Sequence, residues 1–214
     1  MRKRILTFLG ITSLVTTIVI LLISIVIIAI LGAVLGATQS QSQYSDGVLQ
    51  EAVLAYQPLV DKYCKKYEIP KYSPLILAVM QLESGGIGTD PMQCSECPYN
   101  LKYPNVPKGI TNPEYSINIG AQYLASCLRA AGCKSPQDIP GISLALQGYN
   151  FGGGYINWAK AKGGYTLANA KAFSQMKSQQ LGWTSYGDVN YVADVLRYYS
   201  ANDKLSGNCR SVPH

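Results

Sequence analysis

Residues 73–93 read SPLILAVMQLESGGIGTDPMQ, and their apolar half decides the fold. Residues 75–80 are apolar at every position, which is typical of a helix that is surrounded by other elements. Ser73 can cap the N-terminus of such a helix, and the proline after it suits the first helical position. The helix should end at Glu83, because the glycines shortly after it can adopt the left-handed conformation of a C-terminal cap. This segment therefore predicts a central, buried helix that ends on an acid.

Helical periodicity also dominates the rest of the chain beyond its first 47 residues. Apolar residues recur at intervals of three and four, and strand patterns are few. Further helices are predicted at 48–67, where a proline can introduce a kink, and at 117–131, 142–152, 168–180 and 192–199. We therefore predict an all-α globular domain of about seven helices with long loops.

The N-terminus reads MRKR and is followed by Ile5–Leu35, which contains no charged residue. About 20 apolar residues span a bilayer, so residues 1–37 are predicted to form a cytoplasmic basic tip and one transmembrane anchor. Residues 38–47 are small and polar and are predicted to form a tether. A domain at 48–205 and a tail at 206–214 would then lie outside the cytoplasm. The small residues after the apolar run leave cleavage by a signal peptidase open.

The net charge of the chain is +6, and three of its cations belong to the N-terminal tip. The exported part is therefore only mildly basic, which suits either an anionic cell-wall or membrane surface or an ordinary solvated surface. No basic run with interleaved aromatic residues indicates a nucleic-acid partner.

Six cysteines follow the predicted anchor, and outside the cytoplasm an even number of cysteines is typical of disulfides. Six cysteines allow 15 pairings, and the sequence does not choose among them. The Cys94-x-x-Cys97 spacing also matches a zinc site, although the only histidine is the terminal His214. Disulfides are the favoured interpretation, and no metal or organic cofactor is expected. The cysteines are Cys64, Cys94, Cys97, Cys127, Cys133 and Cys209.

Glu83 is a candidate catalytic acid because of its position at the end of an apolar helix. A carboxylate there faces the negative end of the helix dipole, and partial burial also disfavours its charged form. Both effects raise the pKa, which is what a general acid for glycosidic bond cleavage requires. A glutamate at a helix end is also commonly just solvated, so other features have to decide.

Asp90 follows Glu83 by seven residues, across the flexible sequence GGIGT. Such a loop can fold back and bring the two carboxylates together. Glycosidase pairs lie about 5–5.5 Å apart for retention and about 6.5–9.5 Å apart for inversion. Alternatively, Asp90 is a turn residue before Pro91.

Five motifs occur in a fixed order: LILAVMQLESGG, DPMQCSE, SINIGAQYL, ALQGYNFGGGYINWA and YVADVLRYY. Together they resemble the superfamily of goose-type lysozymes and soluble lytic transglycosylases. They are most similar to its CwlT-like lysozyme domain, found in cell-wall hydrolases of Gram-positive conjugative elements. The sequence DPMQ, where many members of the superfamily have GLMQ, favours this branch. The resemblance covers nearly all of 48–200.

The resemblance implies an α-helical lysozyme-like fold that cleaves the β-1,4 bond between N-acetylmuramic acid and N-acetylglucosamine. It implies that Glu83 is the catalytic acid and that Asp90 is tied to muramidase activity. The residues that match groove-lining or substrate-binding positions of the family are Gln93, Tyr149 and Asn150, together with Tyr191, which in related transglycosylases points at the catalytic glutamate.

The sequence therefore predicts a membrane-anchored peptidoglycan muramidase that opens the wall locally for a conjugation or secretion apparatus. Asp90 would help a water molecule to attack or stabilise the developing positive charge. Some members of this branch carry an additional peptidase domain, and no endopeptidase activity is expected here. Two alternatives remain open. One is a lytic transglycosylase, in which the C6 hydroxyl of the sugar attacks and 1,6-anhydro products form. The other is a non-catalytic wall-binding scaffold subunit.

Overall fold

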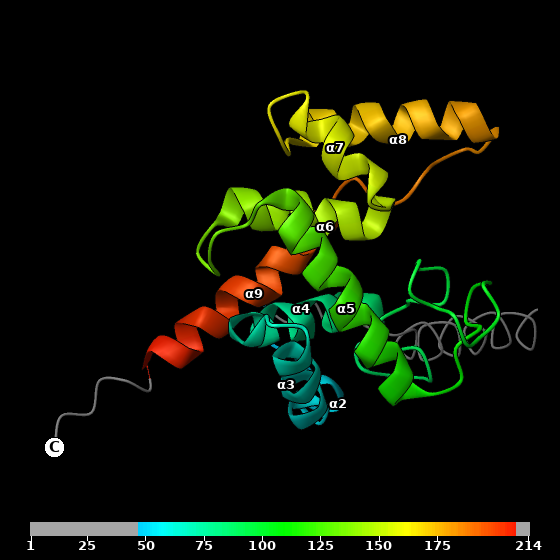
Figure 1. Cartoon of the computed structure of the whole chain (residues 1–214). Helices are drawn as coiled ribbons and strands as arrows, with labels where there is room; N and C mark the ends of the chain where they lie inside the picture. The colour runs from blue at the N-terminus through cyan, green and yellow to red at the C-terminus, as the bar shows by residue number, and fades with distance from the viewer. Residues whose placement is uncertain (1–46, 209–214) are drawn as a thin grey trace, which may run out of the picture. The chain divides into compact units, whose positions relative to one another are not determined.

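The computed structural model describes residues 47–208 of the chain, and only the backbone of residues 200–208 (Figure 1). This part of the chain contains helices and no strand, which confirms the all-α prediction. The predicted anchor and nearly all of the predicted tether lie outside the described residues. Within 47–208, no helix is both long and apolar enough to span a bilayer. The helices are α2 (Glu51–Leu54), α3 (Gln57–Lys66), the 3₁₀ helix η1 (Pro70–Tyr72), α4 (Ser73–Glu83), α5 (Pro113–Ala131), α6 (Ile139–Phe151), α7 (Gly154–Lys160), α8 (Leu167–Leu181) and α9 (Tyr191–Asn208).

Helix α4 is the centre of the core, as its sequence predicts. Every side chain from Leu75 to Met80 is at most 2% exposed. Helices α2, α3 and α9 all pack against α4, and α5 joins α3 to α6 (Figure 1). Because complete burial of a large aliphatic side chain contributes about 1.5–3 kcal/mol, this helix is a major source of stability. Its C-terminus, where Glu83 lies, is therefore surrounded by other elements.

The start of α4 differs from the prediction. Ser73 does not cap the helix, because η1 runs directly into α4 and makes Ser73 its first helical residue. The Ser73 hydroxyl instead donates a hydrogen bond to Asp61 Oδ1 of α3 at 2.6 Å. The side chain thus joins two helices, where the sequence suggested a local cap.

The predicted helix at 48–67 is two helices. The chain turns at Ala55 and Tyr56, and Pro58 lies in the first turn of α3. Proline has no N–H to donate, so it is tolerated in a first turn and disfavoured in a helix interior. The short helix α7 was not among the predicted elements, and it follows directly after the glycines at the end of α6.

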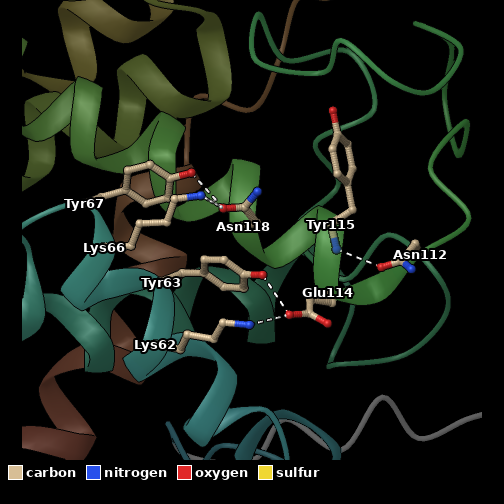
Figure 2. A network of polar contacts seen from close by, with 8 residues as sticks. All are labelled: Lys62, Tyr63, Lys66, Tyr67, Asn112, Glu114, Tyr115 and Asn118. Carbon is tan, nitrogen blue, oxygen red and sulfur yellow. Dashed lines mark hydrogen bonds and ion pairs between the residues drawn. The ribbon is translucent and has the colours of Figure 1, made fainter.

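The contact between α3 and α5 is a ladder of tyrosine and lysine side chains (Figure 2). Tyr63 OH and Lys62 Nζ donate to Glu114 Oε1 at 2.8 and 2.7 Å. One turn further on, Tyr67 OH and a second lysine donate to Asn118 Oδ1. The lysines are exposed and their interactions are screened by solvent, so the partly buried tyrosines determine the register between the two helices.

Gly148 in α6 allows the close approach of α7 and provides a test of the packing. A Cβ atom at this position would lie 2.5 Å from Ile156 Cγ1 and 2.6 Å from its Cδ1. We expect Gly148→Ala to lower the free energy of unfolding by about 1–3 kcal/mol, because overpacking outweighs the helix propensity of alanine. Urea unfolding monitored by circular dichroism measures this change.

Gly154→Ala is the matched control, since a Cβ at the first residue of α7 meets no atom within 4 Å. We expect this variant to be as stable as the wild type or more stable by up to about 1 kcal/mol. Equal unfolding curves for Gly148→Ala and Gly154→Ala would contradict the proposed tight contact.

Candidate active site

Glu83 is the last residue of α4, and its carboxyl group meets the first residue of α9. Tyr191 OH donates a hydrogen bond to Glu83 Oε1 at 2.6 Å. The side chain of Tyr191 is only 3% exposed, so this hydrogen bond is shielded from water. The packing of α4 against α9 thus places two residues that are far apart in sequence in direct contact, and Tyr191 is held against the candidate acid.

Burial raises the pKa of the Glu83 carboxyl to about 7. This value is the net result, in which the hydrogen bond from Tyr191 lowers the pKa and the negative charges of Asp90 and Asp188 raise it. The direction agrees with the effect of burial expected from the sequence. A carboxyl group with this pKa carries a proton in a large fraction of molecules at neutral pH, which suits a proton donor.

The turn after Glu83 is built by serine and glycine. Gly85 and Gly86 have φ angles of 62° and 76°, as predicted for a left-handed helix end. A Cβ at Gly86 would lie 2.7 Å from the backbone of Ala52, so this position also allows α2 to approach. The Ser84 hydroxyl donates to the Pro91 carbonyl at 2.8 Å and thereby ties the two ends of the loop together.

Asp90 is buried, and its carboxylate accepts four hydrogen bonds. The donors are the backbone N–H groups of Cys94 and Ser95, at 3.0 Å each, and the hydroxyls of Ser95 and Ser116, at 2.6 Å each. Ser116 belongs to α5, so Asp90 fastens the loop to that helix. The charge of Asp90 acts on Glu83, but the carboxylate oxygens of Asp90 are already occupied by donors from the loop and from α5.

A cavity of about 510 Å³ opens in front of Glu83. Most of its lining comes from the loop 93–98 and from the segments 149–153 and 183–187. The cavity is lined by Glu83, Gln93, Cys94, Glu96, Cys97, Pro98, Tyr123, Tyr149, Asn150, Phe151, Gly152, Gly153, Trp183, Tyr186 and Gly187. Glu83 and three predicted substrate-binding residues line it, whereas Asp90 and Tyr191 are not part of this lining.

The three predicted substrate-binding residues in the cavity wall are held by the loop after α4 and by the segment that precedes α9. Gln93 is exposed, has a φ angle of 47° and donates from Nε2 to the Asp90 carbonyl at 3.0 Å. Tyr149 is 7% exposed, and its OH donates to the Met92 carbonyl at 3.0 Å. Asn150 Oδ1 accepts the Asp188 N–H at 2.8 Å. Gln93 is the one of the three whose side chain is mainly open to solvent.

Several lining residues were not predicted from the sequence. Glu96 is a second carboxylate in the wall, and Trp183 and Tyr186 are aromatic residues on the segment before α9. Glu96 is the last residue of the motif DPMQCSE, whereas Trp183 and Tyr186 belong to none of the motifs that carry the resemblance. The only available signal was that Trp183 is one of two tryptophans in the chain, and it does not reveal that the side chain faces a cavity.

The predicted disulfides are wrong for the described cysteines. Cys64, Cys94, Cys97, Cys127 and Cys133 are all free thiols, and Cys209 lies outside the described residues. Cys94 Sγ lies 2.9 Å from Tyr149 OH and is packed against the cavity wall. The loop that contains Cys94 and Cys97 is held by the hydrogen bonds of Asp90. Residues 47–208 contain no group of three or more His, Cys, Asp and Glu side chains suited to a metal ion.

Comparison with known proteins identifies the family. Residues 50–209 match the family described as lysozyme-like. The chain belongs to the lysozyme-like family. It is 34% identical over 163 residues to the bifunctional muramidase/DL-endopeptidase CwlT of Bacillus subtilis (strain 168), covering 76% of this chain and 46% of CwlT. The resemblance to a CwlT-like lysozyme domain is thereby confirmed.

Two other proteins are similar to this chain at nearly the same sequence identity. The membrane protein YocA of Bacillus subtilis (strain 168) is 33% identical over 131 residues, covering 61% of this chain and 54% of YocA. A crystal structure described as similar to lipoprotein, NLP/P60 family, from Staphylococcus aureus Mu50 superposes with a TM-score of 0.60 at 33% identity, covering 71% of this chain and 54% of that one. The chain thus spans about half the length of these relatives.

The raised pKa of Glu83 predicts a pH-dependent stability. The folded state holds this proton more tightly than the unfolded chain, so the free energy of unfolding falls as the pH rises from 4.5 to about 7. We expect Glu83→Gln, which cannot ionise, to be more stable than the wild type at pH 8 by up to about 3 kcal/mol. At pH 4 the two proteins should be equally stable. Urea unfolding at both pH values measures the difference.

Glu68→Gln, an exposed substitution after α3, controls for the change from carboxyl to amide. A Glu83→Gln stability difference that is the same at pH 4 and pH 8 would show that Glu83 is an ordinary solvated carboxylate.

Proposed function

We propose that this protein is a peptidoglycan glycosidase that cleaves the β-1,4 bond between N-acetylmuramic acid and N-acetylglucosamine. The observation that carries the proposal is Glu83, a carboxyl group with a pKa of about 7 at the edge of a 510 Å³ cavity. CwlT, whose name includes muramidase activity, supports the substrate class. The amide and tyrosine side chains of the wall suit the hydroxyl and acetamido groups of such a strand.

Glu83 acts as the general acid in the proposed reaction. Its proton passes to the glycosidic oxygen as the bond to the anomeric carbon breaks, and positive charge develops on the sugar ring. The resulting carboxylate then faces this charge across the cavity and stabilises it. Tyr191 OH keeps Oε1 in place, so the other oxygen, Oε2, is the one available to carry the proton to the substrate.

Asp90 is proposed to act as a positioning residue. Its four hydrogen bonds leave little acceptor capacity for a water molecule, and they hold the loop that contains Gln93 and Cys94. Its charge also raises the pKa of Glu83 and so helps to keep the acid protonated. This assignment differs from the direct role in water attack or charge stabilisation that the sequence suggested.

The nucleophile that attacks the anomeric carbon determines whether the reaction is a hydrolysis or a transglycosylation. Hydrolysis needs a water molecule in the cavity, and the exposed carboxylate of Glu96 in the wall is a group that can orient one. A lytic transglycosylase is the second candidate, and the saturation of Asp90 favours it, because attack by the C6 hydroxyl of the sugar needs no second carboxylate. Mass spectrometry of the digested wall separates the two by free reducing ends or 1,6-anhydro ends.

The setting of the reaction is also a proposal. The uncharged run at Ile5–Leu35 supports a single-pass membrane protein whose N-terminus is cytoplasmic and whose catalytic domain is extracytoplasmic. The relative YocA carries the name of a membrane protein. Local opening of the wall for a conjugation or secretion apparatus is the use that we propose, with that machinery as a partner.

Loss of the acid should strongly reduce cleavage. We expect Glu83→Gln to reduce the clearing of peptidoglycan in a zymogram by about 10²- to 10⁴-fold, the usual contribution of general acid catalysis. Glu68→Gln should clear as the wild type does. Equal clearing by Glu83→Gln and wild type would remove Glu83 from the chemistry, and no clearing by the wild type would favour the scaffold alternative.

Substitution of Asp90 tests its positioning role through the pH profile. Because the Asp90 charge raises the pKa of Glu83, Asp90→Asn should move the alkaline limb of kcat/KM to lower pH. At pH 5, where Glu83 stays protonated, the rate of Asp90→Asn should be closer to the wild-type rate than it is at pH 7. An unchanged alkaline limb with a uniform loss at all pH values would instead favour a direct role in water attack.

A further inference from the structure

Trp183 is an exposed aromatic side chain in the wall of the active-site cavity. Its side chain is 59% exposed, which is unusual for so large an apolar residue in a folded domain. It shares the cavity wall with Tyr186 and Gly187 on the segment between α8 and α9. The family motifs and the proposed chemistry leave this residue without a role.

The position of Trp183 is fixed by its surroundings. Gly182 ends α8 with a φ angle of 68°, and Trp183 N–H donates to the Ser178 carbonyl at 2.9 Å. The indole ring stacks on Tyr186, with the ring centres 6.1 Å apart and the planes 28° from parallel. The backbone and one face of the ring are thus held in place, while much of the side chain stays open to solvent.

Tyr186 is in turn anchored to the wall that contains Asn150. Its OH donates to the Phe151 carbonyl at 2.9 Å, and its own carbonyl accepts the Ser174 hydroxyl at 2.7 Å. A Cβ at Gly187 would lie 2.5 Å from the ring of Phe151, so the segment lies directly on the end of α6. The two stacked rings therefore form a rigid platform that adjoins the cavity.

We propose that Trp183, supported by Tyr186, forms a sugar-stacking subsite for a ring of the glycan strand next to the subsite that contains Glu83. An aromatic face matches the apolar face of a pyranose ring, and a rigid stack loses little conformational entropy on binding. Cavities of about 300–1,000 Å³ hold a ligand of several rings, so the volume allows more than one sugar. This proposal rests on the proposed function of the same cavity.

The subsite contributes binding and not chemistry. Trp183 carries no group that transfers a proton, and Glu83 is held by Tyr191 on α9 and not by this platform. Loss of stacking should therefore weaken the bound substrate and the transition state equally, which raises KM and leaves kcat unchanged. The effect should be strong for long strands, which reach the platform, and weak for a disaccharide.

Binding to full-length protein carrying Glu83→Gln tests the subsite without cleavage. Uncrosslinked peptidoglycan glycan strands, labelled at one end, are titrated with Glu83→Gln and with Glu83→Gln/Trp183→Ala, and fluorescence anisotropy is measured. We expect the dissociation constant to rise about 2- to 12-fold on loss of Trp183. Glu83→Gln/Trp183→Phe should recover part of the affinity. Leu181→Ala in the same background, which removes another exposed apolar side chain near the end of α8, should bind as the parent does.

Equal affinity of the parent and the Trp183→Ala variant would overturn the subsite, and so would no binding by either. Failure of the proposed function has a different signature, because wild-type protein would then bind strands and leave them uncut. Kinetics of the active protein give the second readout. A Trp183→Ala change that lowers kcat on a disaccharide would also contradict a binding role.

Discussion

The burial of helix α4 on every side is the constraint on which the fold and the site both depend. An apolar helix that is covered by α2, α3 and α9 has to end somewhere, and its last residue is a glutamate. The same packing that stabilises the fold leaves Glu83 half-buried and so keeps away part of the water that would stabilise its charged form. The raised pKa of the carboxyl is therefore a consequence of the core, and the free energy that its ionisation costs is supplied by the burial of residues 75–80.

The second carboxyl group, in the loop after α4, has a different environment. Asp90 is more deeply buried than Glu83, but it is surrounded by four hydrogen-bond donors. Two carboxyl groups seven residues apart thus have different environments, and this separates their roles. Glu83, with its raised pKa, lines the cavity, while Asp90 accepts the hydrogen bonds that hold the loop. Such pairs of unequal carboxyl groups are a recurrent way to assign acid and support functions in one site.

The sequence was most informative where local patterns and burial agree. The uniformly apolar run, the acid at its end and the left-handed glycines predicted α4 and Glu83, because each depends on neighbours in the chain. The Ser73 cap was wrong because a residue of α3, Asp61, offers a better partner, and no local pattern contains that contact. The disulfides were wrong because the number of cysteines says nothing about the direction of their side chains. Trp183 and Glu96 could not be found for a related reason, since their exposure depends on how distant segments meet around the cavity.

The N-terminal segment of the described chain contacts both the last turn of α4 and the turn after Glu83. Gln50 N–H donates to Gln81 Oε1 at 2.6 Å. Gln81 lies two residues before Glu83 in α4. Gly86 lies against the backbone of α2, so the turn after Glu83 is in contact with the same N-terminal segment. A force that acts on the N-terminal end of the described residues would therefore be passed through these two contacts to the C-terminal end of α4, where Glu83 lies. Tension at the N-terminal end of the domain and the geometry of Glu83 are thus linked.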